Sequence, residues 1–227
     1  MNQTITIRSA FGIVFLSILT AFLVGGVVMG FALSAPEPSK EFLTYISFFI
    51  GQGAMVLPLF YYLSSRKKSI VKSLRLHPVS SNTIIHTIVL ALGFSVISDE
   101  LSRLIELVLP APEYILDLGG ILSPSNPLAF LIMILAFTVI APIGEELLFR
   151  GFLQTFLEKH WKDTTRAVLV TSLFFALIHL NPYWAIQIYI LGVVLGYLAW
   201  RTNSVYPAFI FHGILNAIAL LLGINPE

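Results

Sequence analysis

The sequence has no cysteine and few charged residues, and each shortage excludes a class of protein. Without cysteine the chain has no disulfide framework, thiolate metal site or cysteine nucleophile. Only 11% of its 227 residues are charged and 57% are hydrophobic, whereas soluble domains are about 25% charged. No basic arm or aromatic–basic platform is present, so nucleic acid is not an expected partner. The composition predicts a multi-pass protein of the cell membrane.

Apolar runs of roughly 20 residues, the length that a helix needs to cross the hydrocarbon core, recur along the chain. The expected spans are Ala10–Leu33, Phe42–Leu63, Thr83–Ser98, Pro127–Leu157, Thr164–Leu180, Trp184–Trp200 and Val205–Gly223. The third helix is expected to continue to Leu109, and an eighth embedded segment within Ser98–Leu109 is left open. The predicted fold class is therefore all-α, a transmembrane helix bundle of seven or eight spans that forms a single integral membrane domain over residues 1–227.

The charges between the runs predict an orientation. The region Asp99–Asn126 is mainly acidic, and one earlier loop is basic, with Arg66, Lys67, Lys68, Lys72 and Arg75. Because cytoplasmic loops are enriched in Lys and Arg, the basic loop is expected inside. The N-terminus is then cytoplasmic, and Glu227 at the C-terminus lies outside in a seven-span arrangement.

The most informative stretch follows the apolar run Pro127–Ala141 and contains Glu145-Glu146-x-x-x-Arg150. A charge at a helix centre in the bilayer costs about 2.5–3.5 kcal/mol on insertion scales, and the residues after Gly151 remain largely apolar. On a helix Glu146 and Arg150 are i and i+4 and can pair, while Glu145 points about 100° away. The helix could simply be reaching the cytoplasmic surface, but the pattern favours a buried polar site.

Two later helices carry further polar residues at helical spacing, Phe175-x-x-x-His179 and His212-x-x-x-Asn216. Glu145 precedes a turn at residue 162 by as many residues as His179 follows it, so an antiparallel hairpin places both at one height. Asn216 and His212 are expected about 12–18 Å from the loop at Ser204. The four side chains can thus converge, although a lone His, a lone Asn or the Glu146–Arg150 pair can also be purely structural.

Such a set of side chains has the chemistry for hydrolysis. A carboxylate and a histidine can position and deprotonate water, and a second histidine with an amide can stabilise an oxyanion. Alternatively, Glu145, His179 and His212 could bind Zn²⁺ with water as the fourth ligand, although no His-Glu-x-x-His motif is present. No Gly-x-Ser-x-Gly motif is present either, so serine hydrolysis is not supported.

The three motifs, in this order and in separate helices, resemble the signatures of the CAAX-prenyl-protease and bacteriocin-processing (CPBP, or Abi) family of intramembrane endopeptidases. The resemblance covers residues 127–222, which would be the catalytic core helices. It implies that Glu145 is the general base, that His179 shares the water, and that His212 and Asn216 form the oxyanion site. Glu146, Arg150 and Phe175 would support them. The preferred mechanism requires no cofactor, and zinc held by Glu145, His179 and His212 is the alternative.

The expected function is an intramembrane endopeptidase that cleaves a membrane-associated or lipidated peptide or protein. Its expected partners are that substrate and the lipid bilayer, and no pattern assigns an oligomeric state. The alternative is a non-catalytic membrane-binding or immunity-type protein, in which Glu145 and His179 could be exchanged for Gln without effect. A transporter with a proton relay of buried carboxylates is a third hypothesis, but the sequence shows no inverted repeats.

Overall fold

The computed structural model describes residues 5–37, 39–116 and 124–224, and the regular structure in these ranges is helical. The all-α prediction is therefore confirmed. Residues 117–123 of the acidic connection lie outside the described residues, as do the N-terminal residues 1–4 and Glu227. The elements are α1 Ile7–Ser34, α2 Ser39–Ala54, α3 Leu57–Ser65, α4 Ile70–Ser73, α5 Ser81–Val108, α6 Glu113–Leu116, α8 Pro127–Leu135, η1 Ala136–Ile140, α9 Ala141–Glu146, η2 Leu147–Gln154, α10 Thr155–Trp161, α11 Thr164–Ile178, α12 Ala185–Thr202 and α13 Tyr206–Ile224.

Several of these helices are suited to a membrane. Within the described residues, 5 helices are long and apolar enough to cross one: Ile7–Ser34, Ser39–Ser65, Ser81–Val108, Pro127–Trp161 and Ala185–Thr202. The apolar helices Thr164–Ile178 and Tyr206–Leu222 are shorter. These lengths support a multi-pass membrane protein. The count of seven or eight spans and the cytoplasmic N-terminus stay predictions.

Local sequence explains where the helices begin. Side-chain oxygens of Thr6, Ser80, Asn126 and Asp163 accept hydrogen bonds from backbone N–H groups in the first turns of α1, α5, α8 and α11. Such caps satisfy donors that have no partner within the helix. The α10–α11 hairpin turns at Lys162, whose φ is 54°, directly before the Asp163 cap. The turn predicted at residue 162 is therefore present.

The expected span Phe42–Leu63 is interrupted. Its first part is α2, which ends at Ala54, and its second part is α3, which starts at Leu57. A turn at Met55 and Val56 separates them, and Pro58 follows in the first turn of α3. Proline lacks an N–H and suits the first turn of a helix rather than its interior. The expected span therefore consists of two helices, and Ser39–Ser65 as a whole is still long and apolar enough to cross a membrane.

The long helix Pro127–Trp161 contains two π-helical segments, η1 and η2, on either side of α9. Instead of a simple kink at Pro142, the backbone widens: the N–H of Ala141 reaches the carbonyl of Ala136, a π-type bond. The next carbonyl, that of Phe137, would need the N–H of residue 142, which proline lacks. Pro142 therefore leaves an acceptor on the wall of the bundle.

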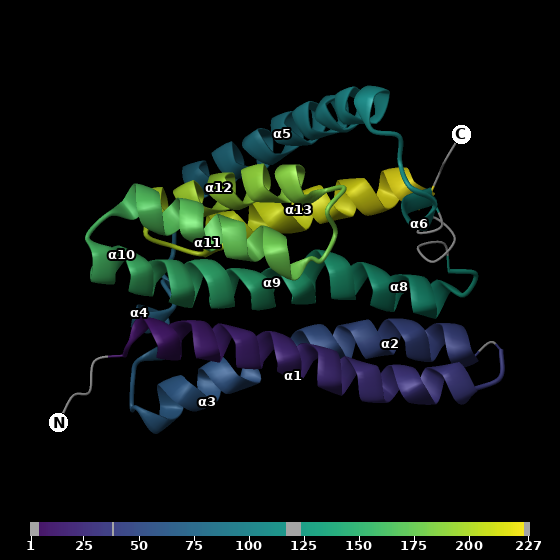
Figure 1. The fold of residues 1–227 in the computed structure, drawn as a ribbon, viewed down its shortest axis with the longest axis horizontal. Helices are drawn as coiled ribbons and strands as arrows, with labels where there is room; N and C mark the ends of the chain where they lie inside the picture. The colour runs from purple at the N-terminus through teal and green to yellow at the C-terminus, as the bar shows by residue number, and fades with distance from the viewer. Residues whose placement is uncertain (1–4, 38, 117–123, 225–227) are drawn as a thin grey trace.

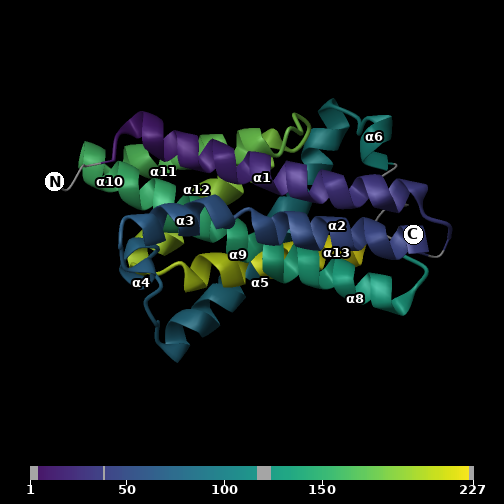
Figure 2. The ribbon, with the colours of Figure 1, turned by 90° about the horizontal axis from the view of Figure 1, so that it is seen from below.

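The long helix forms the middle of the molecule. In Figure 1 the stretch α8–α10 lies between one layer of α1, α2 and α3 and another of α11, α12 and α13, with α5 outside the second layer. The view from below, Figure 2, shows α1 running alongside α2. Element α9 lies near the middle of the long axis (Figure 1), so residues on it are far from both ends of the bundle.

Glycines allow the closest contacts between these helices. A Cβ atom on Gly51 would lie 2.9 Å from the carbonyl oxygen of Ala21, so α2 presses against α1 there. A Cβ atom on Gly213 of α13 would lie 2.6 Å from the carbonyl oxygen of Thr138 in η1. Both contacts are with backbone atoms, which cannot move aside as a flexible side chain can.

We expect Gly213→Ala to destabilise the protein by about 1–3 kcal/mol, the usual cost of overpacking, because its methyl group would meet the backbone of η1. The control is Gly93→Ala on α5, where a Cβ atom would have no atom within 4 Å. Thermal unfolding of the detergent-purified variants measures the difference. Equal melting temperatures for the two variants would show that α13 and η1 are not in close contact.

Candidate active site

A buried ion pair lies at the centre of the bundle. The guanidinium Nη1 of Arg150 donates to Oε1 of Glu146 at 2.8 Å, and both residues are 0% exposed. The second nitrogen, Nη2, donates to the carbonyl oxygen of Gly192 on α12 at 3.0 Å. The guanidinium also lies 4.2 Å from the centre of the Phe175 ring on α11. The predicted Glu146–Arg150 pair thus exists, and its arginine contacts two other helices.

His212 lies between the two adjacent carboxylates. Its Nδ1 is 3.1 Å from Oε1 of Glu146, and its Nε2 is 3.9 Å from Oε2 of Glu145. Because a carboxylate only accepts, Nδ1 carries the proton of the first contact. The second distance is too long for a hydrogen bond. Oε2 of Glu145 is buried without a hydrogen-bond partner, so this carboxylate is not committed to any protein group.

His179 immediately follows the end of α11 at Ile178 and is exposed. Its Nδ1 lies 2.7 Å from the carbonyl oxygen of Phe175, which fixes the proton on Nδ1 and leaves Nε2 unprotonated in the neutral ring. The Phe175 ring lies edge-on between the two imidazoles, 4.8 Å from His179 and 5.8 Å from His212 by ring centroids. Phe175 therefore sets the spacing of both histidines.

Glu145 and His179 line the same cavity, of about 400 Å³. Its other walls come from the middle of α1 and from α2, and they are mainly apolar or glycine, with Gln52 and Ser47 as the polar exceptions. The hairpin count had predicted that Glu145 and His179 lie at one height, and their shared cavity agrees with it. The walls from α1 and α2 were not foreseen.

Asn216, the fourth residue expected in the site, contacts the backbone. Its Nδ2 donates to the carbonyl oxygen of Phe137 at 2.9 Å, the acceptor that Pro142 leaves without a helical donor. The amide group has two N–H bonds, so one remains beside the Phe137 contact. The structure thus gives Asn216 a structural role that the sequence did not predict, and its oxyanion role stays a prediction.

Sequence reasoning also missed Gln154, one turn after Arg150. Its Nε2 donates to the carbonyl oxygen of Gly196 and to Oε1 of Glu158, both at 2.9 Å. Arg150 therefore bonds to the carbonyl of Gly192, and Gln154 bonds to the carbonyl of Gly196. Both the side chains and the glycines are four residues apart, so each pair lies on one face of its helix. In the sequence, the Gly192-x-x-x-Gly196 motif and the amide residue Gln154 within an apolar run could have indicated this contact.

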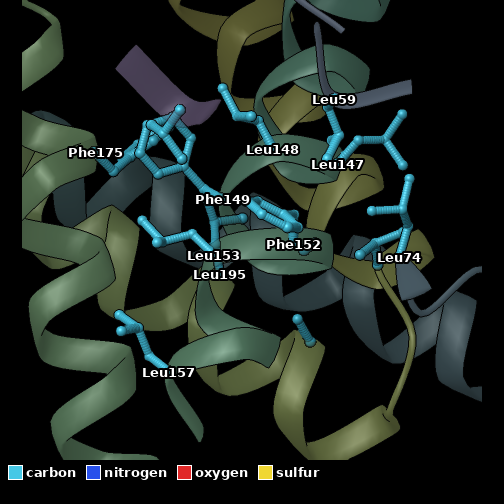
Figure 3. Packing of buried hydrophobic residues seen from close by; sticks show 14 of the residues in the cluster. Leu59, Leu74, Leu147, Leu148, Phe149, Phe152, Leu153, Leu157, Phe175 and Leu195 are labelled. Carbon is cyan, nitrogen blue, oxygen red and sulfur yellow. The ribbon is translucent and has the colours of Figure 1, made fainter. Parts of the chain in front are cut away.

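Apolar side chains surround this polar network. Figure 3 shows Phe149, Leu153 and Leu195 packed close to Phe175, and the two phenylalanine rings meet edge-on with centroids 5.4 Å apart. Leu148, Leu153 and Leu195 are 0% exposed. A surrounding of low polarity strengthens the electrostatic interactions inside it and penalises any charge without a partner.

The zinc alternative concerns Glu145, His179 and His212. Within the ranges that the structure describes, no three His, Asp or Glu side chains are arranged to bind one metal ion. Glu145 and His212 approach each other at 3.9 Å, and the Nδ1 contacts of His212 with Glu146 and of His179 with the Phe175 carbonyl leave both Nε2 atoms free, as in histidines that bind a metal. The mechanism without a cofactor and the zinc alternative both stay predictions.

One comparison with known proteins is informative. Residues 127–218 match the family described as Type II CAAX prenyl endopeptidase Rce1-like. The matched residues include the three motifs. No curated protein and no solved structure matches the chain.

We expect Arg150→Met to destabilise the protein by about 3–5 kcal/mol, because it leaves the Glu146 carboxylate buried without its cation, with only the hydrogen bond from His212. The double variant Arg150→Met with Glu146→Gln should recover much of this loss, since no uncompensated charge remains. Unfolding of both variants in detergent, followed by circular dichroism, gives the comparison. A double variant no more stable than Arg150→Met would show that the charge of Glu146 is not the cause.

Proposed function

We propose that the chain hydrolyses a peptide bond of a membrane-associated or lipidated substrate with water activated by Glu145. Its residues 127–218 match the Rce1-like type II CAAX prenyl endopeptidase family. One observation carries this proposal. Glu145 is only 8% exposed, has an unpartnered carboxylate oxygen, and lines a cavity together with His179. A buried carboxylate beside an accessible cavity is suited to take a proton from a bound water.

The two adjacent glutamates are suited to different roles. Oxygen Oε1 of Glu146 is bonded to both Arg150 and His212, and the residue is 0% exposed, so Glu146 holds other groups in place. Glu145 has no such ion pair with Arg or Lys among the described residues and borders the cavity. Glu145 is therefore the general base of the proposal, and Glu146 positions His212.

In the proposed reaction a water molecule lies between Glu145 and Nε2 of His179, which accepts one of its hydrogen bonds. Glu145 takes one proton while the water oxygen bonds to the carbonyl carbon of the scissile peptide. The carbonyl oxygen becomes an oxyanion, stabilised by His212 when its Nε2 is protonated and by the second N–H of Asn216. The C–N bond then breaks, and the proton held by Glu145 passes to the leaving amine.

The location of the site supports a substrate that reaches it from the membrane. Glu145 and the cavity lie midway along the candidate spans Ile7–Ser34 and Pro127–Trp161. The walls of this cavity from α1 and α2 are mainly apolar, which favours a lipidated or membrane-embedded chain over a soluble one. We propose a cell-membrane location with the N-terminus and the basic loop in the cytoplasm.

We expect Glu145→Gln to lower peptide hydrolysis by about 10²–10⁴-fold, the usual contribution of a general base, because a carboxamide cannot take the proton. The matched control is Glu106→Gln, which makes the same change at an exposed residue on α5. New protein termini are mapped by mass spectrometry in membranes that contain each variant.

Cleavage that persists with Glu145→Gln would remove Glu145 from the mechanism. If neither the wild-type protein nor the control generates new termini, the non-catalytic binding function becomes the better interpretation.

We also expect hydrolysis by the purified protein to continue after dialysis against EDTA, because the proposed water is activated by Glu145 and His179 alone. Metal content is measured before and after dialysis, and activity is compared with a sample to which Zn²⁺ is restored. Activity that is lost with the metal and returns with Zn²⁺ would favour the zinc alternative with Glu145, His179 and His212.

A further inference from the structure

Gln52 on α2 lies at the site although it falls outside the matched residues 127–218. It lines the cavity with Glu145 and His179. Gly144, the residue before Glu145, brings it there, since a Cβ atom at Gly144 would lie 3.3 Å from the backbone oxygen of Gln52. The absent side chain lets α2 approach α9 at this point.

The Gln52 side chain makes no hydrogen bond within the described protein. Its oxygen Oε1 is buried and has no partner. A buried carbonyl-type oxygen without a hydrogen-bond partner costs about 1–3 kcal/mol. A hydrogen-bond donor from a bound molecule would remove this cost. Gln52 lines the cavity, so a group bound there lies next to this side chain.

The rest of the cavity wall indicates the class of that partner. Residues Ile18 to Met29 of α1 form one side, a length of about 16 Å along a helix. This is the length of about five residues of extended peptide. The α1 side is apolar or glycine, and no Lys or Arg lines the cavity. An uncharged, extended apolar peptide segment therefore fits both the length and the chemistry.

From this geometry we infer that Gln52 binds the backbone of the substrate segment that lies next to the scissile bond. The inference rests on the proposed function and extends it to a residue of the first half of the chain. A carboxamide has one acceptor and two donors, which match the N–H and C=O of a peptide group. A peptide group away from the reacting carbonyl keeps these hydrogen bonds in both the bound substrate and the transition state. Gln52 therefore contributes to substrate binding rather than to the chemical step.

The test uses the full-length protein in detergent and a mixture of quenched fluorescent octapeptides built from Ala, Val, Leu, Phe and Gly. We expect Gln52→Met to raise KM roughly five- to tenfold, the range for one lost neutral hydrogen bond, with kcat within about twofold of the wild type. Its melting temperature should stay equal or rise, because the variant removes a buried oxygen that had no partner.

The matched control is Gln187→Met on α12, whose amide donates to Ser102 at 2.7 Å outside this cavity. It should show the opposite pattern, a lower melting temperature with unchanged KM, because it breaks a contact between helices. An unchanged KM for Gln52→Met would overturn the inference. So would a loss of kcat accompanied by a lower melting temperature, which would mark Gln52 as structural.

Direct peptide binding separates this inference from the proposed function. Binding of the same peptide sequences, labelled with the fluorophore but without the quencher, to the Glu145→Gln variant is measured by fluorescence anisotropy, with and without Gln52→Met. If the wild type cleaves nothing but Gln52→Met still weakens binding five- to tenfold, the proposed hydrolysis fails and the role of Gln52 holds. If no peptide binds, or if binding is unaffected by Gln52→Met, the role of Gln52 is wrong.

Discussion

The site depends on the ion pair between Glu146 and Arg150. Each charge alone would be strongly unfavourable in so apolar an interior, and removing one partner of such a pair is more harmful than replacing both. The pair also fixes its neighbours, since Arg150 bonds to Gly192 and contacts Phe175, while Glu146 bonds to His212. One buried interaction therefore positions groups from α11, α12 and α13 around α9.

The widened helix accounts for the contact between Asn216 and the long helix. The two π-helical segments change the direction of side chains before and after α9, and Pro142 removes one backbone donor beside them. Asn216 replaces that donor at the Phe137 carbonyl. π-helical turns are frequent at functional sites, and here the local irregularity of the backbone is what joins α13 to the long helix.

The cavity gives the first half of the chain a part in the site. Helices α1 and α2 pack tightly at Gly51, and together with α9 they enclose the space next to Glu145. Residues 127–218, which match the family, contain Glu145 and the two histidines, while α1 and α2 supply the apolar wall and Gln52. In the proposed reaction the second half of the chain performs the chemistry, and the first half selects what reaches it.

Regularities within single helices could be predicted from the sequence. Apolar length predicted helices that could cross a membrane, and 5 of the described helices are long and apolar enough to do so. The i, i+4 spacing predicted the Glu146–Arg150 pair, because helix geometry is the same in every protein. The hairpin count placed Glu145 and His179 at one cavity, since both belong to neighbouring helices joined by a short turn. Only the tertiary structure decided which distant groups meet. Asn216 with the Phe137 carbonyl and Gln52 with the cavity depend on how helices far apart in the chain are rotated and packed, which no local pattern encodes.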